Sequence, residues 1–113
     1  MITYSRGDWQ LGVSRHYFGR YDRYATRSGA SATLTFTGRQ IAWIAPESAA
    51  RGKASVYIDE NLTTTVNLGR VNAPRTLVFT HEWTNAGTHK LKIVVSGTPR
   101  HPRIDLDAIA ILG

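Results

Sequence analysis

Apolar and polar residues alternate along several short stretches of this chain, which is the period of a β-strand with one buried face. In residues 31–37, Ala32, Leu34 and Phe36 alternate with threonines, and residues 54–59 repeat the pattern. Further strands are predicted at residues 41–44, 62–68, 77–79, 89–95 and 103–112, with a short edge strand at residues 1–4. No stretch has the period of an ordinary helix. The pattern therefore predicts an antiparallel, all-β protein.

Turn-forming residues separate these stretches and predict where the chain reverses. Short turns are predicted at Gly38-Arg39, at Glu60-Asn61 and over residues 82–87. Longer loops are predicted over residues 15–30, 45–52, 69–74 and 97–102. If consecutive strands are antiparallel, successive connections fall at opposite ends of the sheet. The short turns are therefore expected at one end and the long loops at the other.

The inward-facing positions predict a core between two sheets. Trp9 is expected in this core because large aromatic side chains dominate core burial, and His89 falls on an inward-facing position at a strand start. The fourth strand is expected to turn inward the alternate side chains Leu62, Thr64, Val66 and Leu68. The predicted fold is an antiparallel β-sandwich, a jelly roll, formed by residues 1–113 as a single module.

The length and composition fit this architecture as one domain. A chain of 113 residues can bury roughly two thirds of its unfolded surface. Hydrophobic residues make up 42% and charged residues 19%, which is typical of globular proteins and not of disordered ones. Cysteine is absent, so disulfides and cysteine-ligated metal sites are excluded.

The chain shows no sign of membrane insertion. No stretch reaches the roughly 18 apolar residues of a membrane span, and the first residues lack the apolar region of a signal peptide. If the protein is secreted, we expect the signal to lie outside this sequence.

The charge is strongly positive and is predicted to gather at the loop end. The formal net charge is +6 and the isoelectric point is near 10.2, which attracts polyanions without naming one. Asp22 and Glu47 are the only carboxylates expected at this end. Its expected basic residues are Arg15, Arg20, Arg23, Arg27, Arg51, Arg70, Arg75 and Arg100, with Lys53 and Arg103 at its margin.

Arginine and tyrosine side chains make this end the candidate binding site. A guanidinium group can hold a carboxylate, sulfate or phosphate through two hydrogen bonds, and a flat tyrosine ring can stack on a sugar or a base. The alternative is that these loops are simply solvated. The residues predicted to contact a ligand are Tyr21, Arg23, Tyr24, Arg51, Asn72, His101 and Arg103.

Residues for catalysis are not grouped in the sequence. The four histidines lack the spacing of a metal site. Asp105 and Asp107 share one side of a strand, a pattern that favours structural hydrogen bonding or a calcium contact over acid-base catalysis. No nucleophile elbow is present. We therefore expect a protein that is not an enzyme and has no cofactor, with a structural calcium ion left open.

Several segments together resemble a known kind of module. They are ITYS followed by Trp9, then GASATLTFTG, IAWIAP, RGKASVYID, Phe79, GTHKLKIVVSG and the closing IDLDAIAIL. This order is similar to a jelly-roll module of secreted, multidomain bacterial proteins, with a galactose-binding-domain-like fold, and it resembles carbohydrate-binding modules. The resemblance covers nearly the whole chain and implies a non-catalytic domain that binds glycans. It implies no defined set of ligand residues.

Three functions follow from these observations. The first is a carbohydrate-binding module that tethers a larger extracellular or cell-surface protein to a polysaccharide, with the arginines favouring an acidic one. The second is a structural or protein-interaction spacer of a surface protein. The third, nucleic-acid binding, is suggested by the charge and by tyrosines interleaved with arginines, but the resemblance disfavours it. The oligomeric state is left open.

Overall fold

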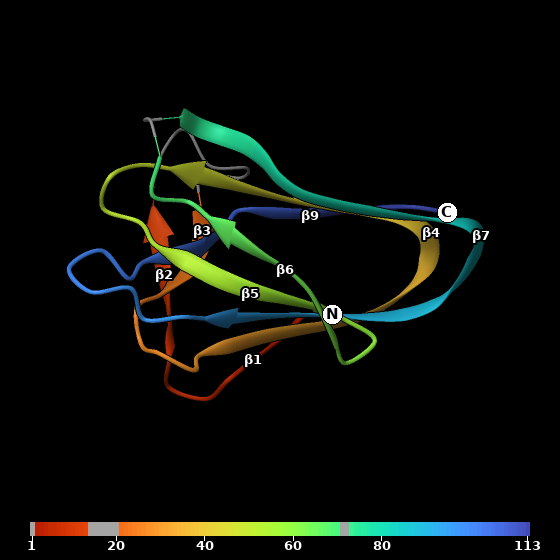
Figure 1. Cartoon of the computed structure of the whole chain (residues 1–113), viewed down its shortest axis with the longest axis horizontal. Helices are drawn as coiled ribbons and strands as arrows, with labels where there is room; N and C mark the ends of the chain where they lie inside the picture. Colours follow the sequence, from red (N-terminus) through yellow and green to blue (C-terminus); the bar gives the residue numbers. More distant parts are fainter. Residues whose placement is uncertain (1, 14–20, 71–72) are drawn as a thin grey trace.

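A computed structural model describes residues 2–13, 21–70 and 73–113, and these residues form nine strands and no helix. The strands are β1 (Ile2–Tyr4), β2 (Trp9–Val13), β3 (Tyr21–Ala25), β4 (Ser31–Glu47), β5 (Lys53–Ile58), β6 (Asn61–Asn67), β7 (Ala73–Val95), β8 (Ile104–Leu106) and β9 (Ala108–Leu112). All strand pairs are antiparallel. The described residues contain no helix of the length and apolar character that a membrane crossing requires. The predicted all-β sandwich is confirmed (Figure 1).

Two long strands, β4 and β7, form the frame of the molecule. They pair along almost their whole length, from Ser31 opposite Val94 to Glu47 opposite Ala73. The predictions that the strands end at turns at Gly38-Arg39 and over residues 82–87 are therefore wrong. The chain does reverse its direction there, but as a bend within each continuous strand (Figure 1).

A register shift between Gly38 and Gln40 accompanies this bend, as an extra residue in one strand bends the pair and increases its twist. Gly38 also lies against the last strand: a Cβ at this position would come within 2.8 Å of both Ile111 Cγ2 and the Leu112 carbonyl oxygen. Only glycine therefore lets β9 cross this closely. Gly38 therefore marks a bend within β4 and not the end of a strand.

The bend gives the sandwich its two layers. In one layer the order is β1, the first half of β4, the second half of β7, β5 and β6. In the other layer β9 pairs with the second half of β4, and the small sheet β2-β3-β8 continues into β9 through Asp107, whose amide donates to the Ile44 carbonyl at 3.2 Å. Each long strand therefore belongs to both layers.

The core lies between the layers and is built from the predicted inward positions. Trp43, Ile41, Leu91 and Ile93 are buried almost completely. The Trp43 indole is also satisfied, because its Nε1 donates to the Asp105 carbonyl at 3.1 Å. Trp9 packs against this core as predicted.

The fourth predicted strand faces inward only in part. The β5–β6 hairpin turns at Asp59 and Glu60, which have positive φ, one residue before the predicted Glu60-Asn61. Val66 and Leu68 are buried as expected, but Leu62 and Thr64 are exposed. A register shift between Val56 and Tyr57 changes the pairing here, and β6 lies at the end of its sheet. An alternating pattern does not reveal that a strand lies at an edge.

Aromatic and histidine rings close the bent end of the sandwich. The rings of Trp83 and His89 stack with centroids 3.8 Å apart, and His89 Nδ1 lies 2.7 Å from an Asp59 carboxylate oxygen. This confirms His89 as an inward-facing side chain. The opposite end of the molecule is left for the loops.

Candidate functional site

Loops from distant parts of the chain meet at the end opposite the bend (Figure 1). We call residues 26–30, 48–52, 68–70 and 96–103 the loop pole. Backbone hydrogen bonds connect its segments: Gly52 donates to the Arg103 carbonyl at 3.0 Å, and Leu68 donates to the Gly52 carbonyl at 2.8 Å. The predicted convergence of the long loops is therefore confirmed for the described residues, except that β4 extends to Glu47 and β7 begins at Ala73. The prediction of a loop over residues 15–30 is wrong for residues 21–25, which form β3 and pair with β2 and β8.

A buried carboxylate organises the charges of the loop pole. Asp105 is fully buried, and it accepts paired hydrogen bonds from two arginines. Arg51 donates from Nε at 2.9 Å and from Nη2 at 3.3 Å. Arg103 donates from Nε and Nη2, both at 2.9 Å. The expectation that Asp22 and Glu47 are the only carboxylates here is thus wrong, because Asp105 neutralises much of the arginine charge.

The buried Asp105 remains ionised because of these partners. Burial alone would raise its pKa, but the neighbouring Asp22 and the hydrogen bonds from Arg103 and Arg51 outweigh burial and lower the pKa. Such paired, charge-assisted bonds fix both guanidinium planes. Arg51 also donates from Nη1 to Ser48 Oγ at 2.7 Å. This bond connects the β4–β5 loop to the group formed by Asp105, Arg51 and Arg103, which we call the Asp105 cluster. This confirms the prediction that Asp105 has a hydrogen-bonding role.

Tyr24 and His101 extend the cluster to the surface. The Arg103 guanidinium carbon lies 4.0 Å from the centre of the Tyr24 ring, within the range of a cation–π contact. The Tyr24 hydroxyl lies 3.0 Å from Gln10 Oε1. His101 Nδ1 lies 2.7 Å from the Arg51 carbonyl oxygen. Four of the predicted binding residues, Tyr24, Arg51, His101 and Arg103, are therefore brought together.

Of the other predicted binding residues, Arg23 lies elsewhere, and the structure does not describe the side chains of the rest. Arg23 precedes Tyr24 on β3, and alternate side chains of a strand point to opposite faces. Its guanidinium accordingly lies over the Tyr4 ring, 5.9 Å from the ring centre. The side chain of Tyr21 and the whole of Asn72 fall outside the described residues, as do Arg15 and Arg20.

A second buried carboxyl, Asp22, lies beside the cluster. Burial and then the neighbouring Asp105 raise its pKa from 3.8 to about 8. No N–H group of the described residues donates to either of its oxygens, and the pKa rises further because the protonated Asp22 forms a hydrogen bond with Asp105. Gly12 faces it on β2, and a Cβ there would collide with Asp22 Oδ1. Asp22 is thus a protonated group at neutral pH, held in a space that only glycine leaves open.

The described part of the chain contains no group of three or more histidine, aspartate or glutamate side chains that could hold a metal ion. The two carboxyls of the cluster face arginines, which already supply positive charge. The structural calcium ion that the sequence left open at Asp105 and Asp107 stays a prediction.

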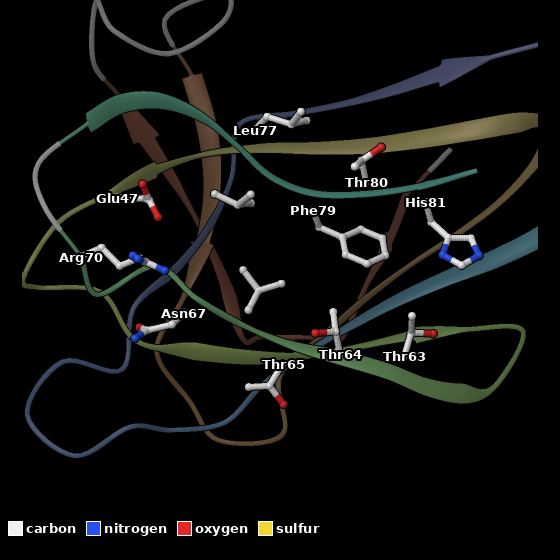
Figure 2. A pocket seen from close by; sticks show the side chains of 12 residues that line it. Glu47, Thr63, Thr64, Thr65, Asn67, Arg70, Leu77, Phe79, Thr80 and His81 are labelled. Atoms are coloured by element: carbon white, nitrogen blue, oxygen red, sulfur yellow. The ribbon is translucent and has the colours of Figure 1, made fainter.

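A cleft with a volume of about 560 Å³ lies between β6 and the first half of β7 (Figure 2). We call it the edge cleft. Figure 2 shows Thr63 and Thr64 on β6 across from Phe79 and His81 on β7. Its remaining lining residues are Glu47, Thr65, Val66, Asn67, Arg70, Leu77, Val78 and Thr80. No pattern in the sequence indicates this cleft, because its two walls come from strands that are not paired with each other.

The edge cleft opens toward the loop pole. Glu47, Asn67 and Arg70 lie together at that end of it (Figure 2). Asn67 Oδ1 accepts from the Gly69 amide at 2.9 Å, which leaves the Asn67 NH₂ group to the cleft. Arg70 is exposed and forms no ion pair with a described residue. The two features thus form one continuous surface.

Comparisons with known proteins place this geometry in context. No protein-family model matches the chain. The computed structure superposes on the CBM36-1 domain of a multidomain xylanase from the hindgut metagenome of Trinervitermes trinervoides, with a TM-score of 0.59 and 12% identity, covering 100% of this chain and 96% of that domain. The chain has the jelly-roll fold of carbohydrate-binding modules.

Other proteins carry the same fold as one part of a longer chain. A family two carbohydrate esterase from Cellvibrio japonicus matches with a TM-score of 0.63 and 19% identity, over 100% of this chain and 33% of the esterase. In sequence, "A type blood alpha-D-galactosamine galactosaminidase" of Flavonifractor plautii is 39% identical over 85 residues, which is 75% of this chain. The matched segment spans 8% of that relative.

Proposed function

We propose that this protein is a non-catalytic carbohydrate-binding module that holds a larger extracellular protein on a polysaccharide. The observation that carries the proposal is the loop pole, where Asp105 fixes two arginines and Arg103 in turn packs on Tyr24. Rigid, planar side chains that are already ordered lose little entropy when a sugar binds. Tyr24, His101 and Arg103 are the proposed contacts, with Tyr21, Arg23 and Asn72 retained from the sequence.

The similar proteins support this proposal. One relative is, by its name, an A type blood alpha-D-galactosamine galactosaminidase, and this chain matches a small segment of it. A module attached to a glycan-degrading enzyme would raise the local concentration of substrate at the active site. Extracellular location belongs to the same proposal.

A preference for an acidic polysaccharide is a separate part of the proposal. Because Arg51 and Arg103 share the Asp105 carboxylate, the preference must come from exposed cations such as Arg100. Binding through such exposed charges weakens as salt increases. The net charge of +6 supports this preference.

Affinity electrophoresis in native gels tests the proposal. We expect retardation in gels that contain a soluble polysaccharide, from a panel of xylan, galactan, β-glucan, dextran, alginate and chondroitin sulfate. Because the proposed module is non-catalytic, incubation of each polysaccharide with the protein should produce no new reducing ends. Retardation in none of these gels would contradict the module function and favour the structural spacer.

The acidic preference has its own variant. Arg100→Gln removes an exposed charge of the loop pole and leaves the Asp105 cluster intact. We expect it to weaken retention on alginate and chondroitin sulfate about two- to fivefold at low salt, in line with one exposed charge contact. Equal retention of wild type and variant at all salt concentrations would contradict the acidic preference alone.

A further inference from the structure

We infer that the edge cleft is the subsite that takes a linear, uncharged stretch of the polysaccharide backbone and binds it through its hydroxyl groups. This inference rests on the proposed function and assigns part of the binding to a surface that continues from Arg70 of the loop pole along β6 and β7. The volume of about 560 Å³ falls within the range of about 300 to 1,000 Å³ that ligand pockets occupy.

Both walls of the cleft end in free strand edges. Among the described residues, β6 pairs only with β5, and residues 73–82 of β7 pair only with β4. An unpaired edge presents backbone N–H and C=O groups in a row. The cleft therefore offers donors and acceptors at regular spacing along its length, which suits an extended chain of repeating hydroxyl groups.

The side chains of the cleft add hydrogen-bonding groups of the same kind. Thr63 and Thr64 carry hydroxyls on the β6 wall, and Asn67 presents its NH₂ group at the loop-pole end. Arg70 supplies donors and Glu47 supplies acceptors at this end (Figure 2). An apolar ligand would leave these groups unpaired, which costs binding energy. A polyhydroxylated chain satisfies them.

The opposite wall provides an apolar surface at Leu77, which is 59% exposed. Phe79 on the same wall is 8% exposed, and its ring is nearly parallel to that of His81, at an interplanar angle of 7° with centroids 6.4 Å apart. A sugar ring has one face of C–H groups that packs on such a surface, while its hydroxyls point sideways. The cleft thus combines an apolar wall with a hydroxyl-bearing wall.

The charge of the cleft favours an uncharged ligand. Arg70 and Glu47 carry opposite charges at the same end, and these two side chains balance each other. Binding in the cleft should therefore be insensitive to salt. This separates it from charge-dependent binding at the loop pole.

The test uses matched substitutions on the whole chain. Thr64→Val removes a hydroxyl and keeps the β-branched shape, and Arg70→Ala removes the guanidinium. Thr35→Val and Arg6→Ala are the controls, because Thr35 and Arg6 are also exposed but do not line the cleft. Affinity electrophoresis against xylan, galactan, β-glucan and dextran at 50 and 500 mM NaCl gives the dissociation constants.

We expect Thr64→Val to weaken binding about fivefold and Arg70→Ala about tenfold, at both salt concentrations. The controls should bind like the wild type. An oligosaccharide fragment of the polysaccharide that retards the protein should then be added in an NMR titration. We expect it to shift the ¹⁵N–¹H amide signals of residues 63–67 and 77–81.

Two outcomes would overturn the inference and remain distinguishable. If the wild type binds but both cleft variants bind equally well, and the shifted amides lie within residues 98–103, the edge cleft is not a subsite and the proposed function stands. If the wild type binds no polysaccharide at all, the proposed function fails and the inference fails with it.

Discussion

At the scale of single residues, the paired arginines on Asp105 determine how the loop pole is held. Breaking a buried ion pair by removing one partner leaves an uncompensated charge and costs about 3–5 kcal/mol. Asp105 is fully buried, and two guanidinium groups depend on it. The cluster therefore contributes to the order of the binding surface and not only to its charge.

Replacement of Asp105 tests this role. We expect Asp105→Asn to lower the free energy of unfolding by about 3 kcal/mol or more, measured by urea denaturation. The control is Glu60→Gln, which removes an exposed ion pair with Lys90 and should cost less than about 1 kcal/mol. Similar losses in the two variants would show that the Asp105 cluster is not a structural centre.

The pH dependence of stability should reveal Asp22. Its pKa is raised from 3.8 to about 8, so between these values the folded state holds a proton that the unfolded chain releases. The free energy of unfolding should therefore fall as pH rises from about 4 to about 8. The lowered pKa of Asp105 acts in the opposite direction, with stability lost as pH falls below its usual range, so it does not mask this window.

Asp22→Asn does not titrate and should flatten this slope. Urea denaturation of the wild type and the variant at several pH values between 4 and 9 measures the difference. Parallel slopes for the two proteins would contradict the assignment of the proton to Asp22.

At the scale of secondary structure elements, the bend in β4 and β7 creates the two layers. Gly38 and Gly87 face each other across this bend, but their surroundings differ. A Cβ at Gly38 would press on the backbone of β9, whereas a Cβ at Gly87 would meet the movable ring of His89 at 3.3 Å. The bend tolerates a side chain on one strand better than on the other.

Alanine substitutions at the two glycines test this difference. Gly38→Ala should lower the free energy of unfolding by about 1–3 kcal/mol through overpacking against β9, and Gly87→Ala by clearly less. Urea denaturation gives both values. A larger loss for Gly87→Ala would contradict the proposed close crossing of β9.

The sequence predicts strands where apolar and polar residues alternate, as at residues 31–37, and misses β2 and β3, whose residues do not alternate clearly. It fails at Gly38, since a glycine that ends a strand and a glycine that bends one have the same local signal. It also misses the Asp105 cluster, because Arg51 is 54 positions away from Asp105 in the chain. The edge cleft could not be predicted for a similar reason. β6 and the first half of β7 are not paired with each other, and only the folded arrangement of the strands brings them to opposite sides of one cleft.

The convergence of the loops was predictable, because it needs only strand direction and connection length. Tyr24, Arg51, His101 and Arg103 were grouped correctly on that basis. Arg23 was grouped with them although strand parity places it on the other face of β3. Residues 21–25 were expected to form a loop, so strand parity could not be applied there before the structure showed β3.

At the scale of the whole molecule, the sandwich places a rigid loop pole beside an open edge cleft. The net charge of +6 overstates the positive potential of the loop pole, because Asp105 neutralises part of it. Recognition of a polysaccharide would then combine planar side chains at the loop pole with hydrogen-bonding groups in the cleft.

Thermal unfolding with and without polysaccharides tests the central claim most directly. A ligand that binds only the folded state must raise the midpoint. At tenfold excess over the dissociation constant, the stabilisation of about 1.4 kcal/mol should raise the midpoint by roughly 5 °C. We predict such a rise with at least one polysaccharide of a neutral and acidic panel. An unchanged midpoint with every polysaccharide, at low and at moderate salt, would contradict the account.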